Sequence, residues 1–289
     1  MKKHLEKIIS YGLYPALLTI VMLAITLSVD VGLDYKLVSG IITVFLVLIL
    51  VVTETIFPLS VEWRMTKRSF WRDLKYILID APVVALINMV FGWIAIYYSE
   101  RHTGYFLHAP IIVSVVAYLV VFEFFQYWYH RLSHDAKGKI GRFLWKVHVA
   151  HHLPDKVYVF MHAVFNPING SIATIIIQVP LILLGISPEA TMAATMLIGL
   201  QGLVSHFNVD VKAGWLNYIL IGTETHRYHH SANRNEAKNY GVVLAIWDIV
   251  FGTFYYRPGA LPIKLGVDNP EDYPGSQNLI GILLLPFKR

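Results

Sequence analysis

The chain has 289 residues, of which 56% are hydrophobic and only 15% charged, with 24 lysines and arginines against 19 acidic residues. Because a soluble domain carries about 25% charged residues, this composition excludes an ordinary soluble enzyme and a disordered chain, and it indicates a polytopic membrane protein. Cysteine is absent from the sequence, which excludes disulfides, iron–sulfur clusters and thiolate metal sites. Any bound metal must be held by nitrogen and oxygen.

Charge-free stretches long enough to cross a bilayer follow one another along the first half of the chain. They cover residues 11–29, 37–53, 81–99 and 103–122, and the second extends towards residue 60 past Glu54. A helix needs about 20 apolar residues to cross the hydrocarbon core. Each stretch therefore predicts one membrane-spanning helix.

Two further apolar stretches, residues 163–188 and 190–205, are separated only by Glu189. Ser187, Pro188 and Glu189 are typical of an N-cap, a first-turn proline and an early acidic residue, so a new helix should begin there. We expect these two stretches to form a helical hairpin.

The distribution of lysine and arginine predicts the orientation of the spans. Basic residues gather in residues 1–10, 62–75 and 131–156, whereas the two alternate loops hold a single basic residue each, Lys36 and Arg101. By the positive-inside rule, the N-terminus and the histidine-rich regions described below are expected on the cytoplasmic side. The net charge of +5 then reflects topology, and we expect no nucleic-acid partner.

Together these features predict an all-α fold. We expect a polytopic membrane helical bundle of about four spans plus the hairpin, with a histidine-rich helical cap on the cytoplasmic face. No internal repeat, low-complexity tract or linker divides the sequence, so residues 1–289 are expected to form a single integral-membrane domain.

Eight of the 13 histidines occur in three short motifs, one HxxxH and two HxxHH. Their histidines are His130 and His134, then His148, His151 and His152, then His226, His229 and His230. Positions i, i+3 and i+4 of a helix share a face, so each motif should direct its imidazoles to one side. A lone buried histidine is usually a hydrogen-bonded core residue, but three such motifs in one chain predict a metal site.

The number of imidazoles narrows the choice of metal. Eight exceed the four ligands of one tetrahedral zinc and suit two ions of a borderline metal such as iron. The first motif also lacks the general-base glutamate of a zinc protease, because Arg131 stands in its place. A membrane haem electron carrier is an alternative of another class; haem needs two axial ligands, whereas a di-iron centre would use all eight.

The motifs and their flanks resemble those of the fatty acid hydroxylase superfamily, which includes sterol desaturases, methylsterol oxidases and alkylglycerol monooxygenases. The order HxxxH, HxxHH, HxxHH is similar, and so are the flanking segments. These are residues 127–131, 143–148, 205–209, 215–217, 239–241, 247–248 and 251–253. The resemblance covers roughly residues 115–257 and implies a membrane-bound non-haem di-iron oxygenase whose catalytic core lies there.

The resemblance implies roles for particular residues. The eight motif histidines become ligands of two Fe ions, and His206 becomes a ninth ligand. One departure follows the second motif, where the family often shows Arg, any residue, His and Pro. This chain has Val-Phe-Asn-Pro at residues 164–167, with His162 nearby but out of register. Asn166 is therefore expected to substitute as a polar group beside the ligands, or else substrate access at this position differs from that in the family.

Three more polar residues are candidates to support the ligands. Asn239 and Asp248 are expected to hydrogen-bond the outer ring nitrogens of histidines, as metal sites generally require, or else to fix a helix end or face water. Glu123 precedes His130 by two helical turns on the same face. A charge at that depth is costly unless it is paired, so we expect Glu123 beside the ligands; the alternative is a side chain that snorkels to the membrane interface.

The chemistry that such a centre performs sets the expected function. It uses O2 and two external electrons to attack an unactivated C–H bond, here of a lipid whose tail enters from the bilayer. One site can yield an alcohol or an alkene, so the motifs predict a lipid hydroxylase and leave a lipid or sterol desaturase as the alternative; an inactive lipid-binding protein is a third. The sequence has no GxGxxG element, so a separate electron donor, a ferredoxin or a cytochrome b5-like protein, is expected. The basic loops would suit an acidic carrier.

Overall fold

The computed structural model describes residues 2–99 and 104–288, and over these residues it is helical with no β-strand. Five of its helices are long and apolar enough to cross a membrane. They are α1 (Lys2–Val31), α2 (Tyr35–Ile56), α3 (Lys67–Ser99), α4 (Ile111–Asp135) and α6 (Pro167–Leu184). The predicted all-α bundle is confirmed. Arg101 and Thr103 lie outside the described residues.

Two of these helices begin elsewhere than the apolar stretches predict. Helix α3 starts at Lys67, fourteen residues before the apolar stretch, because its first turns carry polar residues that still favour a helix. Helix α4 starts only at Ile111, with Pro110 at its N-cap position. Proline restricts the residue before it to extended conformations, so the apolar residues that precede Pro110 form turns instead of a helix.

The predicted hairpin is present as α6 and α7 (Pro188–Ser205). Gly185 ends α6 in the left-handed conformation (φ 60°), and the Ser187 side chain accepts a hydrogen bond from the backbone N–H of Ala190. The first arm begins at Pro167 and not at residue 163. Helix α6 begins there because Asn166 is its N-cap, and residues Val159–Ala163 form a separate 3-10 turn, η2.

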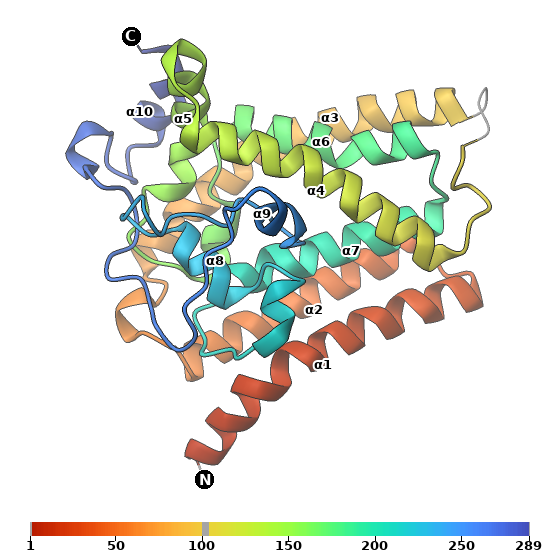
Figure 1. Ribbon diagram of the computed structural model, residues 1–289, viewed down its shortest axis with the longest axis horizontal. Coiled ribbons are helices and arrows are strands. Elements are labelled where there is room, and N and C mark those ends of the chain that lie inside the picture. The colour runs from red at the N-terminus through yellow and green to blue at the C-terminus, as the bar shows by residue number, and fades with distance from the viewer. Residues whose placement is uncertain (1, 100–103, 289) are drawn as a thin grey trace.

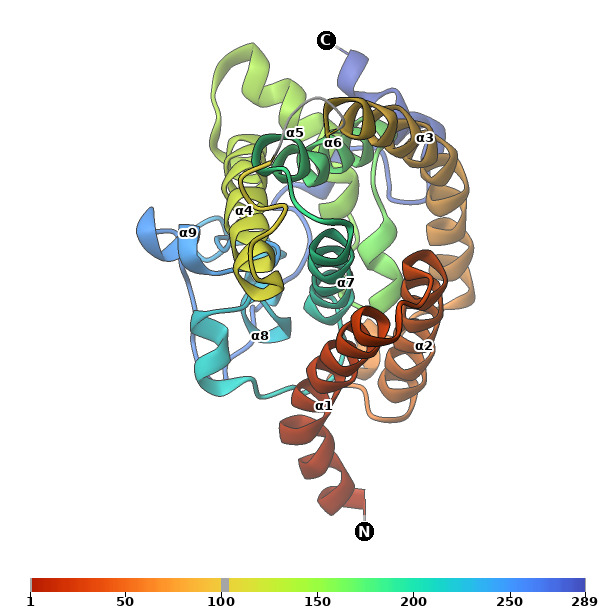
Figure 2. The same cartoon turned by 90° about the vertical axis from the view of Figure 1, so that its right-hand side faces the viewer.

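Helix α7 lies at the centre of the bundle (Figure 2). One of its sides packs in an apolar core shared with α1 and α2, and the other packs in a second core shared with α4 and α6. It is rich in small residues, with Ala193, Ala194, Gly199 and Gly202 among its eighteen. Small residues let neighbouring helices approach closely.

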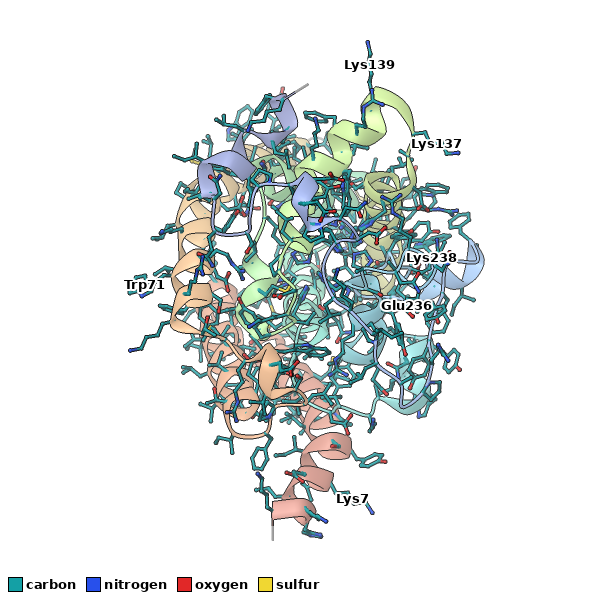
Figure 3. The ribbon with its side chains drawn as sticks, turned by 90° about the vertical axis from the view of Figure 1, so that its left-hand side faces the viewer. Lys7, Trp71, Lys137, Lys139, Glu236 and Lys238 are labelled. Carbon is teal, nitrogen blue, oxygen red and sulfur yellow. The ribbon has the colours of Figure 1, made fainter. Side chains whose placement is uncertain are left out.

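The turns that join the helices gather at two opposite ends. At one end, the backbone N–H of Phe106 donates to the Leu184 carbonyl, and the Tyr35 hydroxyl donates to Glu189. The other end carries the short elements. These are α5 (Gly138–His152), η3 (Gly214–Tyr218), α8 (Thr223–His229), α9 (Ile246–Val250) and α10 (Leu279–Leu283), with η2 (Figure 1). Figure 3 looks at this end and shows Lys7, Lys137 and Lys139 projecting from it.

Candidate metal centre

Nine histidine side chains converge at this second end in two groups, in each of which one ring nitrogen per residue lies within 4.8 Å of the others. The five-histidine group comprises His130, His134, His148, His152 and His229. The four-histidine group comprises His151, His206, His226 and His230. Each group brings together residues from helices far apart in the sequence. All nine histidines that the sequence singled out are gathered here.

The two groups divide each HxxHH motif between them. On α5, His148 and His152 belong to the five-histidine group and His151 to the other. On α8 and its C-cap, His226 and His230 belong to the four-histidine group and His229 to the other. Successive helical residues advance about 100°, so i and i+4 point almost the same way while i+3 and i+4 diverge by about 100°. The expectation that a whole motif faces one side was wrong for this reason.

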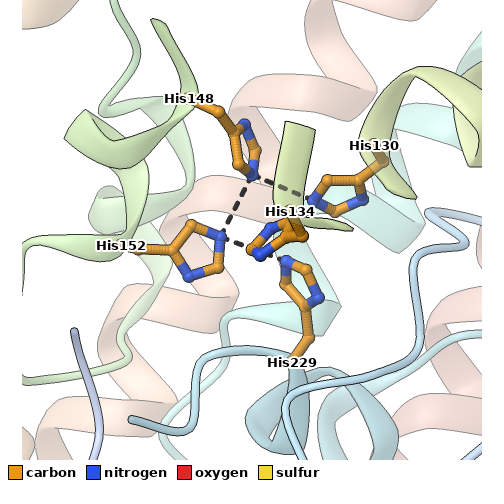
Figure 4. A group of neighbouring side chains, drawn as sticks. All are labelled: His130, His134, His148, His152 and His229. Carbon is orange, nitrogen blue, oxygen red and sulfur yellow. Dashed lines mark hydrogen bonds between the residues drawn. The ribbon is translucent and has the colours of Figure 1, made fainter. Parts of the chain in front are cut away.

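Within each group the Nε2 atoms face one another at nearly constant spacing. His148 Nε2 lies 3.0 Å from His130 Nε2 and 3.1 Å from His152 Nε2, and His152 Nε2 lies 3.1 Å from His229 Nε2 (Figure 4). Metal–imidazole bonds of about 2.0–2.1 Å place adjacent ligand atoms roughly 3 Å apart. The observed spacing is that of ligands around an ion.

The four-histidine group is organised around His206, which occupies the C-cap of α7. Its Nε2 lies 3.1 Å from the Nε2 atoms of His151 and His230 and 3.2 Å from that of His226. His226 and His230 are in turn 3.1 Å apart, Nε2 to Nε2. This group therefore shows the same ligand-like spacing as the other.

The outer nitrogens show why the inner ones need a cation. The Nδ1 atoms of His130, His229 and His206 lie 2.7, 3.0 and 3.1 Å from the carbonyl oxygens of Tyr240, Lys238 and Gly202. A carbonyl can only accept, so these Nδ1 atoms carry the hydrogen and each neutral ring keeps a lone pair on Nε2. Facing lone pairs cannot bond to one another, and a metal ion between them satisfies both.

Burial keeps these rings neutral. It lowers the pKa of His148 to about 4 and that of His229 to about 3. Burial, with repulsion between neighbouring rings, holds the pKa values of the others outside the spanning helices well below the usual range. These are His151, His152, His226 and His230. Metals bind the neutral imidazole, so the site is in its binding form at pH 7.

Glu123 and Asp248 act through the backbone. The Glu123 carboxylate accepts hydrogen bonds from the backbone N–H groups of residues 242–244 at 2.6–3.0 Å, and Asp248 accepts from those of Tyr240 and Gly241 at 2.9 and 2.7 Å. Together they fix the segment whose Tyr240 carbonyl accepts from His130. For Asp248, the direct contact with a histidine ring that was one of our two expectations is replaced by this indirect one, because the unpaired N–H groups of a buried loop compete for the carboxylates.

Asn239 and Asn166 also bond to backbone groups in the described part of the chain instead of to histidine rings. The Asn239 amide donates to the carbonyls of Thr225 and Tyr255, in a residue that itself adopts φ 59°. Asn166 accepts from the backbone N–H of Ile168 as the cap of α6. The proline that follows Asn166 starts the helix there, and a helix start needs an acceptor for its free N–H groups.

Asn169 makes the contact that we had assigned to other residues. Its side-chain oxygen lies 3.0 Å from His148 Nδ1 and accepts from the Tyr129 hydroxyl at 2.6 Å. Asn169 was missed because it lies three residues into the hairpin, where we expected only apolar packing. The signal was available: a polar residue inside an apolar arm is costly unless it is bonded.

His162 is a tenth histidine at the edge of the four-histidine group. Its ring lies 5.2 Å from that of His206, and its buried Nδ1 has no hydrogen-bond partner among the described residues. It fits there because residue 202 is glycine: a Cβ at Gly202 would lie 2.6 Å from His162 Cε1. The sequence analysis did not predict that His162 lies beside His206, because His162 does not align with the histidine that the family often shows after the second motif.

Two clusters of neutral imidazoles at one end of a bundle of apolar helices define a histidine-rich site that could hold metal ions, next to helices long and apolar enough to cross a membrane. Residues 115–253 match the family model for fatty acid hydroxylases. All nine clustered histidines fall within the matched residues. The resemblance inferred from the motifs is confirmed.

Curated relatives have related names. The chain is 27% identical over 252 residues to an ornithine lipid hydroxylase of Rhizobium tropici, covering 84% of this chain and 73% of the relative. It is 32% identical over 133 residues to human alkylglycerol monooxygenase (46% of this chain, 28% of the relative). It is 28% identical over 232 residues to methylsterol monooxygenase 1-3 of Arabidopsis thaliana (72% and 76%). No solved structure matches the chain.

Proposed function

We propose that this protein is a membrane-bound non-haem di-iron oxygenase that hydroxylates a C–H bond of a lipid, using O2 and two external electrons. The observation that carries the proposal is the pair of adjacent histidine groups, built from three motifs and His206 within the residues that match the fatty acid hydroxylase family model. The names of the relatives, which include hydroxylases and monooxygenases of lipids, support an oxidoreductase.

The residues present fit two metal ions. The five-histidine group would hold one ion and the four-histidine group the other, since each offers converging Nε2 lone pairs and no charged ligand. Buried His134 Nε2, which has no hydrogen-bond partner among the described residues, fits a ligand atom as well. When bound and reduced, such ions supply the oxidising power that removes hydrogen from an unactivated carbon.

The protein's own residues hold and shield that site. Carbonyls and the Asn169 amide fix the tautomer and orientation of the rings, so that the Nε2 atoms converge before a metal arrives. Eight of the nine histidines are at most 4% exposed, and His134 is half-buried beside the cavity described below; this burial protects a reactive centre from side reactions. No histidine needs to lose a proton on binding, because burial already keeps the rings neutral.

A cavity of about 420 Å³ connects the five-histidine group to the surface of this end. It reaches His134, His152 and His229, and its polar lining includes Arg142, Arg234, Asp268 and Asp272. We infer that a separate electron donor, a ferredoxin or a cytochrome b5-like protein, approaches here. We further propose that this end is cytoplasmic, because the basic segments 62–75 and 131–156 join helices at this end.

The spacing of the histidines argues against the haem alternative. A haem carrier binds its two axial nitrogens on opposite faces of a porphyrin. Nε2 atoms 3.0–3.2 Å apart leave no room for a macrocycle between them. The desaturase alternative uses the same proposed site. Because two of the relatives are named sterol desaturases, the experiment below also tests for desaturation.

The experiment combines metal analysis with lipid mass spectrometry. Purified protein should contain iron, and membranes that carry it, supplied with O2 and a reductant, should convert a lipid to a product with one added oxygen. The panel should include an ornithine lipid, an alkylglycerol and a sterol. Loss of two hydrogens without added oxygen would instead identify a desaturase.

Variants provide the control. His151→Ala and His229→Ala each remove one histidine, from the four- and the five-histidine group respectively, and both should abolish turnover. His108→Ala, at an exposed histidine near the opposite end of the bundle, should leave it unchanged. Protein without iron, or full activity in both centre variants, would refute the proposal.

A further inference from the structure

Two segments outside the five candidate spans pair to form one surface. The backbone N–H of Ile221 donates to the Val243 carbonyl at 2.8 Å, and that of Ala245 donates to the Ile219 carbonyl at 2.9 Å. The Tyr218 and Phe254 rings pack with centroids 5.3 Å apart. Element η3 and helix α9, which belong to these two segments, are thereby held together.

The surface is strongly apolar and exposed. Six large side chains from η3, α9 and the residues beside them are at least 41% exposed, and Trp215 reaches 70%. We name this set the α9 face: Trp215, Tyr218, Ile219, Ile246, Ile249 and Val250. Soluble surfaces rarely carry so many neighbouring apolar side chains, and such patches mark contact with a protein or a membrane.

Charge is missing from the same segments. Residues 213–223 contain no charged residue, and residues 240–256 contain only Asp248. Asp248 is fully buried, and its carboxylate accepts from backbone N–H groups and from the Thr253 hydroxyl. The α9 face therefore offers no charge to water, unlike α5, where Lys137 and Lys139 project outward (Figure 3).

The α9 face adjoins a membrane-spanning helix. The Trp247 indole on α9 donates to the Val120 carbonyl of α4 at 3.1 Å, and its ring packs 5.0 Å from that of Phe124. Both views show α9 outside the bundle and beside α4 (Figures 1 and 2). Earlier on α4, Ile112 and Val116 are exposed apolar residues of the span itself. The α9 face thus continues the lipid-facing surface of α4 towards the histidine end.

We propose that the α9 face lies in the bilayer and contacts lipid in the leaflet next to the histidine end. We identify lipid as the occupant because the α9 face is continuous with the middle of the α4 span. If the α9 face were in water, the adjoining part of α4 would be in water too, and the apolar side chains of both surfaces would be exposed. Trp215 and Tyr218 suit the headgroup boundary, where aromatic residues are enriched. The segment leading into α8, which carries the third histidine motif, is then membrane-embedded, independently of which reaction the centre performs.

The absence of cysteine from the natural chain allows a direct test with single-cysteine variants. Ile249→Cys and Trp215→Cys probe the α9 face. Val116→Cys on α4 is the lipid-facing reference, and Ile140→Cys, 74% exposed between Lys139 and Arg142 on α5, is the aqueous reference. Each purified full-length variant is reconstituted in phosphatidylcholine vesicles and treated with a membrane-impermeant maleimide from both sides.

The two α9-face thiols should react at least about tenfold more slowly than that of Ile140→Cys, because an apolar surrounding disfavours the reactive thiolate. A bimane label at either position should be quenched by phosphatidylcholine with brominated acyl chains, as at Val116→Cys. Thermal midpoints equal to that of the parent protein show that the variants are folded.

Two outcomes would overturn the proposal. Reaction of both thiols at the rate of Ile140→Cys would place the α9 face in water. Protection that grows with protein density, without quenching by the brominated lipid, would identify a second copy of the chain as its partner. Using two positions keeps the test decisive if one variant does not fold.

Discussion

The rings of His152 and His230 stack with their centroids 4.6 Å apart and their planes inclined by 25°, although the two belong to different histidine groups. One comes from the second motif and the other from the third. The pair forms a common wall, so the two groups are adjacent compartments of one centre. In each HxxHH motif, the histidines at positions i and i+4 belong to one compartment, and the histidine at position i+3 belongs to the other.

Removing one histidine should affect its own compartment first. We expect His134→Ala to lose the ion of the five-histidine group and His226→Ala that of the four-histidine group, each variant keeping about one of the two ions. Elemental analysis of purified protein measures this. His108→Ala should retain the full complement. Equal loss of all metal in both variants would contradict two separable sites.

Asn169 should control metal affinity without touching a metal. Asn169→Leu removes the acceptor for His148 Nδ1, so the ring loses its fixed tautomer, and affinity should fall about 10- to 100-fold as for other partners of ligand histidines. Competition with a chelator measures the change. Asn88→Leu, at an asparagine that accepts from Gln178 on the lipid side of the bundle, is the matched control and should bind metal normally.

Gly202 should be intolerant of a side chain. A Cβ at this position would lie 2.6 Å from His162 Cε1, so Gly202→Ala must displace His162 or α7 and lower the thermal midpoint, at a cost of about 1–3 kcal/mol as for other overpacked sites. Gly199→Ala on the same helix meets no atom within 4 Å and should be neutral or stabilising. Equal midpoints for the two variants would show that His162 moves freely.

Glu123 should be a strong determinant of stability. Glu123→Ala leaves the three backbone N–H groups of residues 242–244 without their acceptor, and each unsatisfied buried donor costs about 1–3 kcal/mol. The thermal midpoint should fall markedly, and metal content should fall with it, because the neighbouring Tyr240 carbonyl holds His130. Glu271→Ala, at an exposed glutamate, should change neither quantity.

The metal-free protein should lose stability in acid. The pKa values of His148 and His229 are lowered to about 4 and about 3 by burial, against about 6.5 in the unfolded chain. The unfolded state therefore binds more protons between these values, and stability that is present above pH 6.5 is lost as the pH falls towards 4.

Thermal midpoints of the metal-free protein at pH 7.5 and 5 test this expectation. His4→Gln, at an exposed histidine, should leave the difference between the two midpoints unchanged. A metal-free protein as stable at pH 5 as at pH 7.5 would show that the histidines are hydrated or already protonated in the folded state.

Much of the fold and the centre follows from local sequence. Charge-free length predicts the spans because the bilayer imposes a fixed thickness, and Ser187 and Pro188 mark the second arm of the hairpin because helix starts need caps. Eight of the nine clustered histidines were identified from their helical spacing in the three motifs, and His206 was identified from the family resemblance.

The roles of the supporting residues depended on contacts between distant segments. Glu123 and Asp248 bond to the loop that follows the third motif, and Asn169 bonds to His148 from the hairpin. No local pattern specifies which free N–H or ring nitrogen a buried polar group will meet, because the partner is 7 to 121 residues away. The division of each HxxHH motif between two groups likewise depends on how α5 and α8 are rotated against α4 and α7.

The sequence alone therefore determined the kind of protein, a helical membrane protein with a candidate metal centre of nitrogen ligands, since composition and residue spacing are local properties. Only the tertiary structure decided which histidines share a compartment, which polar groups hold them, and that α9 lies beside α4. These relationships arise from packing, where the burial of one segment dictates which polar groups of another must be satisfied.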